Sequence, residues 1–148
     1  MTTIFDLLEE DHQHVDKLLK RIGSSKNDAS KRSALLEEVY QDLEKHMHFE
    51  EAEVYPAIQK AMGEEGELKH AVKEHREARQ LLKALRKTID KGDEGWIGQL
   101  KELQAAIKHH VSEEEDELFP QAREKVAKTK AEKLASQYRA SKKLAAAE

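Results

Sequence analysis

Four stretches of the sequence carry apolar residues at the spacing of an amphipathic helix, and short glycine-containing breaks separate them. The breaks lie at Gly23-Ser24-Ser25, at residues 63–66 and at residues 92–95. A glycine that follows such a stretch is the usual left-handed residue that ends a helix. The pattern predicts helices at about 4–22, 30–62, 67–90 and 95–127, with a fifth helical segment over 130–146. Because helices joined by short loops pack beside their neighbours in the chain, we expect an all-α fold, an up-down-up-down antiparallel four-helix bundle with a C-terminal helical tail.

The composition agrees with a helical domain. The 148 residues are enough for one hydrophobic core, and 38% of them are charged while 5% are aromatic. The chain has no cysteine, which excludes disulfides and thiolate ligands. The N-terminus lacks the positively charged start of a leader peptide, and no apolar run approaches the roughly 20 residues that a membrane span needs. We therefore expect a cytoplasmic protein, a monomer or a homodimer, with no membrane partner.

Charge divides the chain into two regions. Residues 121–148 hold eight Lys or Arg against three Glu, a charge of +5. Since the net charge of the whole chain is −4, the first 120 residues together carry a charge of −9. We expect residues 1–127 to form the bundle and residues 128–148 to be a basic Ala/Lys-rich tail or short helix. Because no series of aromatic residues lies between its basic ones, we interpret the tail as a solvated helix or a frayed end and expect no nucleic-acid partner.

A short motif occurs twice. His46-x-x-x-Glu50 is followed by Tyr55-Pro56, and His110-x-x-x-Glu114 is followed by Phe119-Pro120. In both copies the proline comes ten residues after the histidine. The second and fourth predicted helices therefore carry two copies of one arrangement.

A helical wheel indicates which polar residues face the core. In both copies of the motif the glutamate falls about 25–30° from the centre of the apolar stripe and the histidine about 65–70° from it, on the same side. In the first and third helices His12 and His75 lie about 40° and 50° from the stripe centre, whereas His14, His48 and His109 face solvent. The candidate site residues are therefore His12, His46, Glu50, His75, His110 and Glu114.

Two further histidine–glutamate pairs have the same spacing. His70-x-x-x-Glu74 is a third copy, and because His70 lies at the edge of its apolar stripe it remains a rival to His75. His109-x-x-x-Glu113 is a fourth pair, and it points outward.

The two inward glutamates indicate a metal site. A buried carboxylate costs several kcal/mol unless it is paired, protonated or bound to a cation. An isolated inward histidine is compatible with an ordinary hydrogen-bonded core residue, but two inward glutamates on facing helices would repel each other, and no inward Lys or Arg is available at their level. Imidazole and carboxylate ligands without thiolate favour iron or manganese over calcium or structural zinc. Two carboxylates shared by four imidazoles suggest two metal ions.

Read together, these motifs resemble the hemerythrin-like, or HHE cation-binding, domain family, in its H-HxxxE-H-HxxxE subgroup. The resemblance covers about residues 4–127. It implies a non-haem diiron centre of the Fe–O–Fe type, bridged by Glu50 and Glu114. The motifs that carry it are Leu7-Leu8-Glu9-Glu10-Asp11-His12, His46-x-x-x-Glu50 with Tyr55-Pro56, Glu74-His75, and His110-x-x-x-Glu114 with Phe119-Pro120. In that arrangement His12 and His46 serve one iron, and His75 and His110 the other.

The sequence departs from the oxygen-carrying hemerythrins in two places. Those proteins have a second histidine one turn before the equivalent of His75, where this chain has Ala71, and their fourth-helix motif is HxxxxD, where this chain has HxxxE. Both irons would then keep an open position, which favours turnover over reversible O2 carriage. The resemblance implies a catalase- or peroxidase-like diiron oxidoreductase acting on hydrogen peroxide. The alternative is a module that binds, senses or stores O2, NO or iron without turnover.

Two tyrosines are weak candidates for a role at this site, as a phenol ligand or a radical relay. They are Tyr40 and Tyr55, and for each of them an ordinary place in the core is an equally good interpretation.

Overall fold

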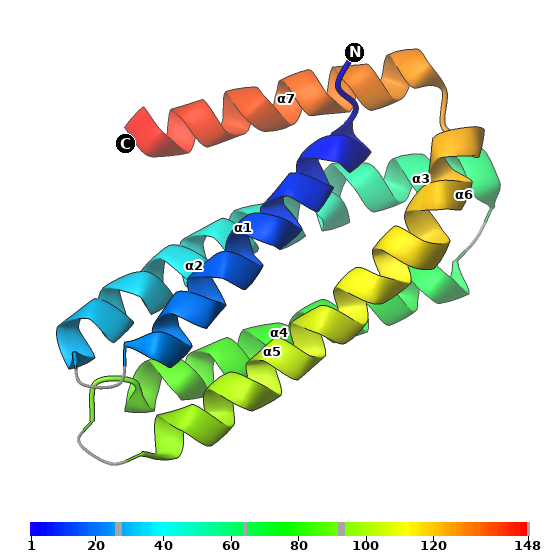
Figure 1. The fold of residues 1–148 in the computed structure, drawn as a ribbon. Helices are drawn as coiled ribbons and strands as arrows, with labels where there is room; N and C mark the ends of the chain where they lie inside the picture. The colour runs from blue at the N-terminus through cyan, green and yellow to red at the C-terminus, as the bar shows by residue number, and fades with distance from the viewer. Residues whose placement is uncertain (26–27, 64, 92–93, 148) are drawn as a thin grey trace.

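The computed structural model describes residues 1–25, 28–63, 65–91 and 94–147, and every secondary-structure element in this part of the chain is helical (Figure 1). α2, η1 and α3 follow one another directly and form one long arm, and α5, η2 and α6 form another. The elements are α1 Ile4–Ser24, α2 Ala29–Phe49, η1 Glu50–Val54, α3 Tyr55–Met62, α4 Gly66–Thr88, α5 Gly95–Glu113, η2 Glu114–Leu118, α6 Phe119–Lys125 and α7 Lys128–Ala147.

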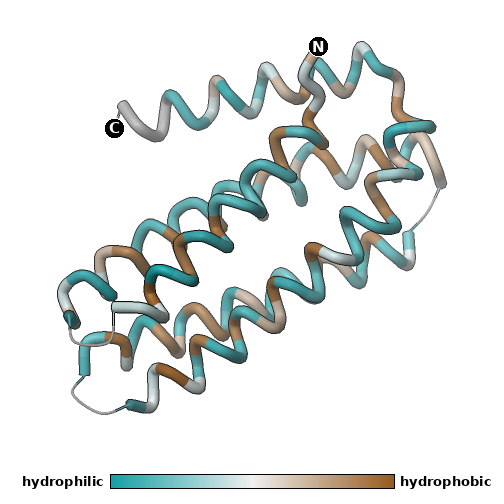
Figure 2. The backbone as a smooth tube through the Cα atoms, viewed as in Figure 1, coloured by the Kyte–Doolittle hydropathy of each residue, from teal (hydrophilic) through white to brown (hydrophobic). Residues whose placement is uncertain are grey.

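These two arms, together with α1 and α4 as the other two long arms, form an up-down-up-down bundle. α1 packs along α2 and α4 along α5, while contacts of α1 with α5 and of α2 with α4 close the square. Figure 1 shows the two pairs lying side by side, and hydrophobic and hydrophilic residues alternate along every helix (Figure 2). The predicted all-α bundle is confirmed. Within the described ranges, none of the helices has the length and apolar character needed to cross a bilayer.

Local signals explain where the helices start and stop. Thr3 and Asp6 form a capping box at the start of α1, in which the Thr3 backbone N–H donates to Asp6 Oδ2 at 2.9 Å. Gly63 ends α3 in the left-handed conformation, with a φ of 71°. Gly23 does not end α1 as predicted. The helix runs on to Ser24, and the hydroxyl and backbone N–H of Ser25 both donate to the Ile22 carbonyl. The third predicted break, around residues 92–93, lies outside the described residues.

Both copies of the repeated motif contain a π-helical turn that the sequence pattern did not predict. η1 begins at Glu50 and η2 at Glu114, and the backbone N–H groups of Tyr55 and Phe119 bond to the carbonyls of those glutamates, five residues back. A proline follows immediately in each copy, and it has no N–H to continue an ordinary α-helical ladder. Such single π turns occur mostly at functional sites. Here each one starts at an inward glutamate.

The core consists of two hydrophobic clusters with a polar layer between them. One cluster includes Phe5, Ile58 and Phe119, and the other includes Leu19, Leu82 and Leu103. Along α1, His12 lies between Leu8, which belongs to the first cluster, and Val15, which belongs to the second. Ala61, which the helical period places on the apolar stripe of the second predicted helix, is exposed at the end of α3. The polar layer holds the six predicted site residues.

α7 packs against α1 outside the four-helix square (Figure 1). One face of α7 is buried and carries Ala131, Leu134, Ala135 and Tyr138. The structure therefore differs from the expected solvated helix or frayed end, because only the outer face of α7 meets solvent. The four buried residues have the spacing of three or four that is typical of one helix face. Four apolar residues in a segment of basic composition were too weak a signal to predict that this face is buried.

We predict that Leu134 attaches α7 to the bundle. Its side chain is 1% exposed, so Leu134→Ala should lower the free energy of unfolding by about 2–4 kcal/mol. The exposed neighbour Lys133 is the matched control, and Lys133→Ala should change it by no more than about 0.5 kcal/mol. Urea titrations of the two variants make the comparison, and equal effects would show that α7 does not dock through this face.

Candidate metal centre

All six predicted residues converge at the middle of the bundle. Each long arm contributes: the histidines come from α1, α2, α4 and α5, and the glutamates from the first positions of η1 and η2. Glu50 is fully buried and Glu114 is 1% exposed. The set comprises His12, His46, Glu50, His75, His110 and Glu114.

Each glutamate faces one histidine from each side of the site. Glu50 Oε1 lies 3.1 Å from His46 Nε2 and 3.2 Å from His75 Nε2. Glu114 Oε1 lies 3.2 Å from His12 Nε2 and 3.4 Å from His110 Nε2. The imidazole rings themselves lie in two pairs, one on α1 and α2 and the other on α4 and α5, with ring centroids 4.9 Å and 4.7 Å apart. Each carboxylate thus lies between two pairs of imidazoles.

These close approaches are not hydrogen bonds. The Nε2 atoms of His12 and His46, both oxygens of Glu50 and Oε1 of Glu114 are buried without a hydrogen-bond partner among the described residues. Their separations are within ion-pair distance, but the geometry is not that of a hydrogen bond. Buried polar atoms in native proteins are nearly always satisfied, so such a group of exceptions needs a specific cause.

A bound transition metal would satisfy these atoms. Two ligand atoms at right angles around a cation, each with a bond of about 2.1 Å, lie roughly 3 Å apart. The nitrogen-to-oxygen distances of 3.1–3.4 Å between the histidines and glutamates come close to that value. The ligand atoms also form two groups that meet at the carboxylate of Glu114. The residues present therefore fit a metal centre with room for more than one ion.

A carboxylate holds the other nitrogen of every one of these histidines. The Nδ1 atoms lie 2.6–3.0 Å from their carboxylate partners, the pairs being His12 with Glu115, His46 with Asp11, His75 with Glu51 and His110 with Glu74. Because a carboxylate only accepts, each Nδ1 carries a proton and donates it, which leaves the Nε2 lone pair for a metal. Such carboxylate–histidine–metal relays fix the ring orientation and raise the basicity of the ligand.

Sequence reasoning missed these four carboxylates, although the sequence contains a signal for them. In both copies of the repeated motif the inward glutamate is followed by a second one, Glu51 or Glu115. Each second glutamate reaches the histidine of the opposite helix pair. The other two carboxylates, Asp11 and Glu74, directly precede His12 and His75 in the sequence and reach the histidine of their own helix pair.

α7 takes part in this outer layer. The Tyr138 hydroxyl donates to Asp11 Oδ2, and Lys142 Nζ donates to Asp11 Oδ1 at 2.6 Å. Burial opposes the charge of Asp11, but its bonds with His46, Lys142 and Tyr138 lower its pKa to about 2. The C-terminal helix therefore supports His46 through Asp11.

The two candidate tyrosines have different positions. The Tyr55 hydroxyl donates to Glu114 Oε2 at 2.6 Å and lies 3.3 Å from His75 Nε2. Tyr40 lies outside the cluster, on α2 six residues before His46, with the Arg86 guanidinium 4.0 Å from its ring centre. The position equivalent to Tyr55 in the second copy is Phe119, which has no hydroxyl. Of these two equivalent positions, that of Tyr55 brings a phenol hydroxyl to a buried glutamate and that of Phe119 does not.

The buried charges explain the titration of the site when no metal is bound. Burial opposes protonation of His46 and His110, but the nearby carboxylates prevail and raise the pKa of each to about 10. Burial also opposes ionisation of Glu114, yet the charge of His110 holds the pKa of Glu114 well below its usual value. Burial and the two carboxylates raise the pKa of Tyr55 well above its usual range, so that it keeps its proton. Protons thus balance the charge that a metal would otherwise balance.

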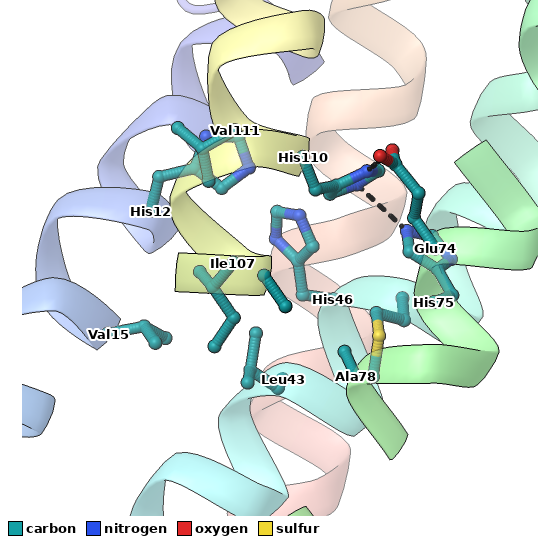
Figure 3. Close-up of a pocket in the computed structure, with 12 residues that line it drawn as sticks. His12, Val15, Leu43, His46, Glu74, His75, Ala78, Ile107, His110 and Val111 are labelled. Atoms are coloured by element: carbon teal, nitrogen blue, oxygen red, sulfur yellow. Dashed lines mark hydrogen bonds and ion pairs between the residues drawn. The ribbon is translucent and has the colours of Figure 1, made fainter. Parts of the chain in front are cut away.

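A small cavity of about 30 Å³ adjoins the site (Figure 3). Four of its lining residues are site histidines and a fifth is Glu74. The rest of its wall is apolar and consists of Val15, Leu43, Met47, Ala78, Ala106, Ile107 and Val111. The cavity has room for only a very small ligand, since a single water needs roughly 10–15 Å³ by this kind of measure.

The structure also shows that His75, and not His70, faces the buried glutamates. His75 is 1% exposed and its Nε2 faces Glu50, whereas the side chain of His70 is half exposed on the surface of α4. His48 and His109 are likewise exposed, as predicted.

Comparison with known proteins agrees with this geometry. The sequence matches the hemerythrin HHE cation-binding domain family over residues 3–122. The fold is similar to the crystal structure of a hemerythrin HHE cation-binding domain-containing protein from Mycobacterium kansasii. The TM-score is 0.80 and the identity 25%, and the match covers 95% of this chain and 85% of that one.

Two relatives with curated sequences are also similar. An uncharacterized hemerythrin-like protein of Schizosaccharomyces pombe is 27% identical over 146 residues, which cover 97% of this chain and 70% of that protein. A protein of Nostoc sp. named a DNA nickase is 28% identical over 139 residues, which cover 94% of this chain. This chain spans 39% of the length of the Nostoc protein.

We predict that Glu50 is needed for metal but not for the fold. Glu50→Gln removes a buried carboxylate that lies within 3.2 Å of two histidines, so the metal bound per chain should fall to less than half of the wild-type content. The helix content of the metal-free protein should stay that of the wild type, because glutamine keeps the size and shape of the side chain. Elemental analysis and circular dichroism measure the two effects. His48→Ala, at an exposed position of α2, is the control and should bind as much metal as the wild type. A Glu50→Gln protein that retains the wild-type metal content would refute the assignment of this ligand.

We also predict a pH dependence that metal removes. The pKa of His46 and of His110 is raised from 6.5 to about 10 on folding, so the stability they contribute is complete below pH 6.5 and is lost as the pH rises through about 10. The loss should be at least about 1.4 kcal/mol for each histidine, the equivalent of one pKa unit. Urea titrations of metal-free protein between pH 6 and pH 10 test this. The metal-loaded protein should show no such loss, and a metal-free protein with constant stability over this range would contradict the prediction.

Proposed function

This chain belongs to the hemerythrin HHE cation-binding domain family, and on this basis we propose that it is a non-haem diiron protein that decomposes hydrogen peroxide. The observation that carries the proposal is the position of the two buried carboxylates. Glu50 and Glu114 each lie within 3.4 Å of one histidine from the α1–α2 pair and one from the α4–α5 pair. A carboxylate placed between two sets of imidazoles is suited to bridge two ions.

The donor set supports iron. It contains four imidazole nitrogens and two carboxylates, without thiolate, and this combination suits iron or manganese. His12 and His46 would hold one ion, and His75 and His110 the other. Two irons held there would supply reversible two-electron redox chemistry.

The surroundings of the site support a reaction with a small ligand. Each ion would have two histidines and a share of two carboxylates, which leaves positions free. Ala71 supplies no ligand where oxygen-carrying hemerythrins have a histidine. The adjoining cavity of about 30 Å³ is large enough only for molecules such as hydrogen peroxide, O2 or NO.

The balance of the proposed reaction needs no further reagent. Two molecules of hydrogen peroxide give two of water and one of O2, one molecule losing two electrons and the other gaining them. Protons must move between the two molecules, and Tyr55 is placed to assist. Its hydroxyl donates to Glu114 Oε2, with 2.6 Å between the two oxygens, and lies 3.3 Å from Nε2 of His75, which lines the cavity.

The alternative is a module that binds O2, NO or iron without turnover. The apolar wall of the cavity suits a neutral diatomic ligand as well as it suits peroxide. The two functions differ in one observable, which is whether peroxide is consumed catalytically by protein that holds two irons.

We predict that the iron-loaded protein releases O2 from hydrogen peroxide, measured with an oxygen electrode. Tyr55→Phe should slow this release by about tenfold or more with iron content unchanged, because general acid–base groups typically contribute 10²–10⁴-fold. Tyr40→Phe, on the same long arm but outside the site, should leave the rate unchanged. Protein with two irons that is inert to peroxide and forms a stable O2 or NO adduct would instead establish the binding module.

A further inference from the structure

A second group of potential metal ligands lies on the surface, where α4 and α5 run side by side. The group takes one His-x-x-x-Glu pair from each helix, and we call it the outer cluster. Its ligand atoms all lie within 4.8 Å of one another. Its members are His70, Glu74, His109 and Glu113.

The spacing of the outer cluster suits a bound cation better than direct ion pairs. Glu74 Oε2 lies 3.4 Å from Nε2 of both His70 and His109, and His70 Nε2 lies 3.4 Å from Glu113 Oε2. These distances exceed those of good N–H···O hydrogen bonds. Only the fourth contact, of 2.9 Å between His109 Nε2 and Glu113 Oε1, falls in the hydrogen-bond range. Two imidazoles and two carboxylates from neighbouring helices thus surround one point that is open to solvent.

Glu74 provides an independent reason to expect a cation here. It is 9% exposed, and of the four carboxylates that support the buried histidines it is the most deeply buried. Asp11 has Lys142 as a partner and Glu51 has Arg79, whereas Glu115 is a third exposed to water. Within the described ranges, Glu74 has no Lys or Arg at ion-pair distance. Its Oε1 accepts from His110 Nδ1 at 2.8 Å and its Oε2 faces the outer histidines.

The pseudo-symmetry of the bundle allows the surroundings of Glu74 to be compared directly with those of Asp11. Asp11 and Glu74 occupy equivalent places, each preceding a site histidine and holding the histidine of the next helix. At Asp11, α7 covers the place and supplies the Lys142 ammonium group. At Glu74 no helix of the described part of the chain takes the corresponding place, and two exposed imidazoles lie there instead.

We propose that the outer cluster is a second metal site, which takes a divalent transition-metal ion from solvent, and that it supplies Fe²⁺ to the buried centre. Nitrogen and oxygen ligands in this ratio suit Fe²⁺, Co²⁺, Ni²⁺ and Zn²⁺. Glu74 is the link, because its two oxygens face the outer cluster and His110, respectively, and it also lines the cavity beside the buried ligands (Figure 3). The supply role rests on the proposed diiron function, whereas metal binding at the outer cluster does not.

The binding part is tested by calorimetric titration of the full-length protein with Zn²⁺, after every variant has been incubated with Fe²⁺ in the same way. The double variant His70→Ala/His109→Ala should bind one Zn²⁺ per chain fewer than wild type. The control variant His48→Ala also loses an exposed imidazole, but on α2 and outside the groups of potential metal ligands, and it should bind as wild type does. Equal losses in the two variants would show non-specific binding to surface histidines and overturn the proposal. So would no loss in either.

A second variant distinguishes the loss of a metal ligand from a change in fold. Glu113→Gln keeps both histidines and the size of the side chain, and it should weaken the extra Zn²⁺ by at least tenfold with helix content by circular dichroism unchanged. If Glu113→Gln binds Zn²⁺ as wild type does, the carboxylate is not a ligand and the site is not the one we propose.

The supply part is tested by the rate at which metal-free protein takes up Fe²⁺. The His70→Ala/His109→Ala variant should fill at least tenfold more slowly than wild type and the His48→Ala control, and reach the same two irons per chain. The same rate in all three would overturn the supply role. A wild type that never holds buried iron would instead refute the diiron function, and the Zn²⁺ titration would still decide whether the outer cluster binds metal.

Discussion

The structure depends on two carboxylates that face each other in the middle of a hydrophobic core. Glu50 and Glu114 are almost completely buried, and no Lys or Arg among the described residues lies within ion-pair distance of either. Such a pair is very unfavourable unless positive charge lies between its members. Four imidazoles surround the pair and can supply that charge as protons or leave room for it as metal. The two hydrophobic clusters on either side then hold the polar layer in place.

The site is built from two similar halves, the α1–α2 pair with η1 and the α4–α5 pair with η2, and the surroundings of the two halves differ. In each half a helix brings a carboxylate followed by a histidine, and the next arm brings His-x-x-x-Glu-Glu ending in a π turn. The halves differ in three places: Tyr55 has a hydroxyl where Phe119 has none, Lys142 covers Asp11 where exposed histidines face Glu74, and α7 packs against α1 and the Phe49 ring of α2. A symmetric site would bind ligands equally from both sides. These differences give the site one phenolic proton and one side open to solvent.

Sequence alone was sufficient for the bundle and for the six central residues, because both depend on helical periodicity. The wheel placed His46 and His110 correctly even though they lie some way from the centre of the apolar stripe. The wheel could not identify the carboxylates that accept hydrogen bonds from the Nδ1 atoms of the four histidines. Glu51 and Glu115 are only partly buried and look like solvated residues in the pattern, and their partners lie on another helix pair. The π turns were also missed, since their only sequence signal is a proline inside a helical stretch. The docking of α7 depends on a few apolar residues in a basic segment, so composition predicted the wrong environment.

We propose that the polar layer is a two-metal centre. An anomalous difference map from crystals of protein grown with iron, with data collected at the iron absorption edge, would test this. We expect two peaks inside the bundle, between Glu50 and Glu114, one beside the His12–His46 pair and the other beside the His75–His110 pair. No peak there, or a single peak bound to one pair alone, would contradict it.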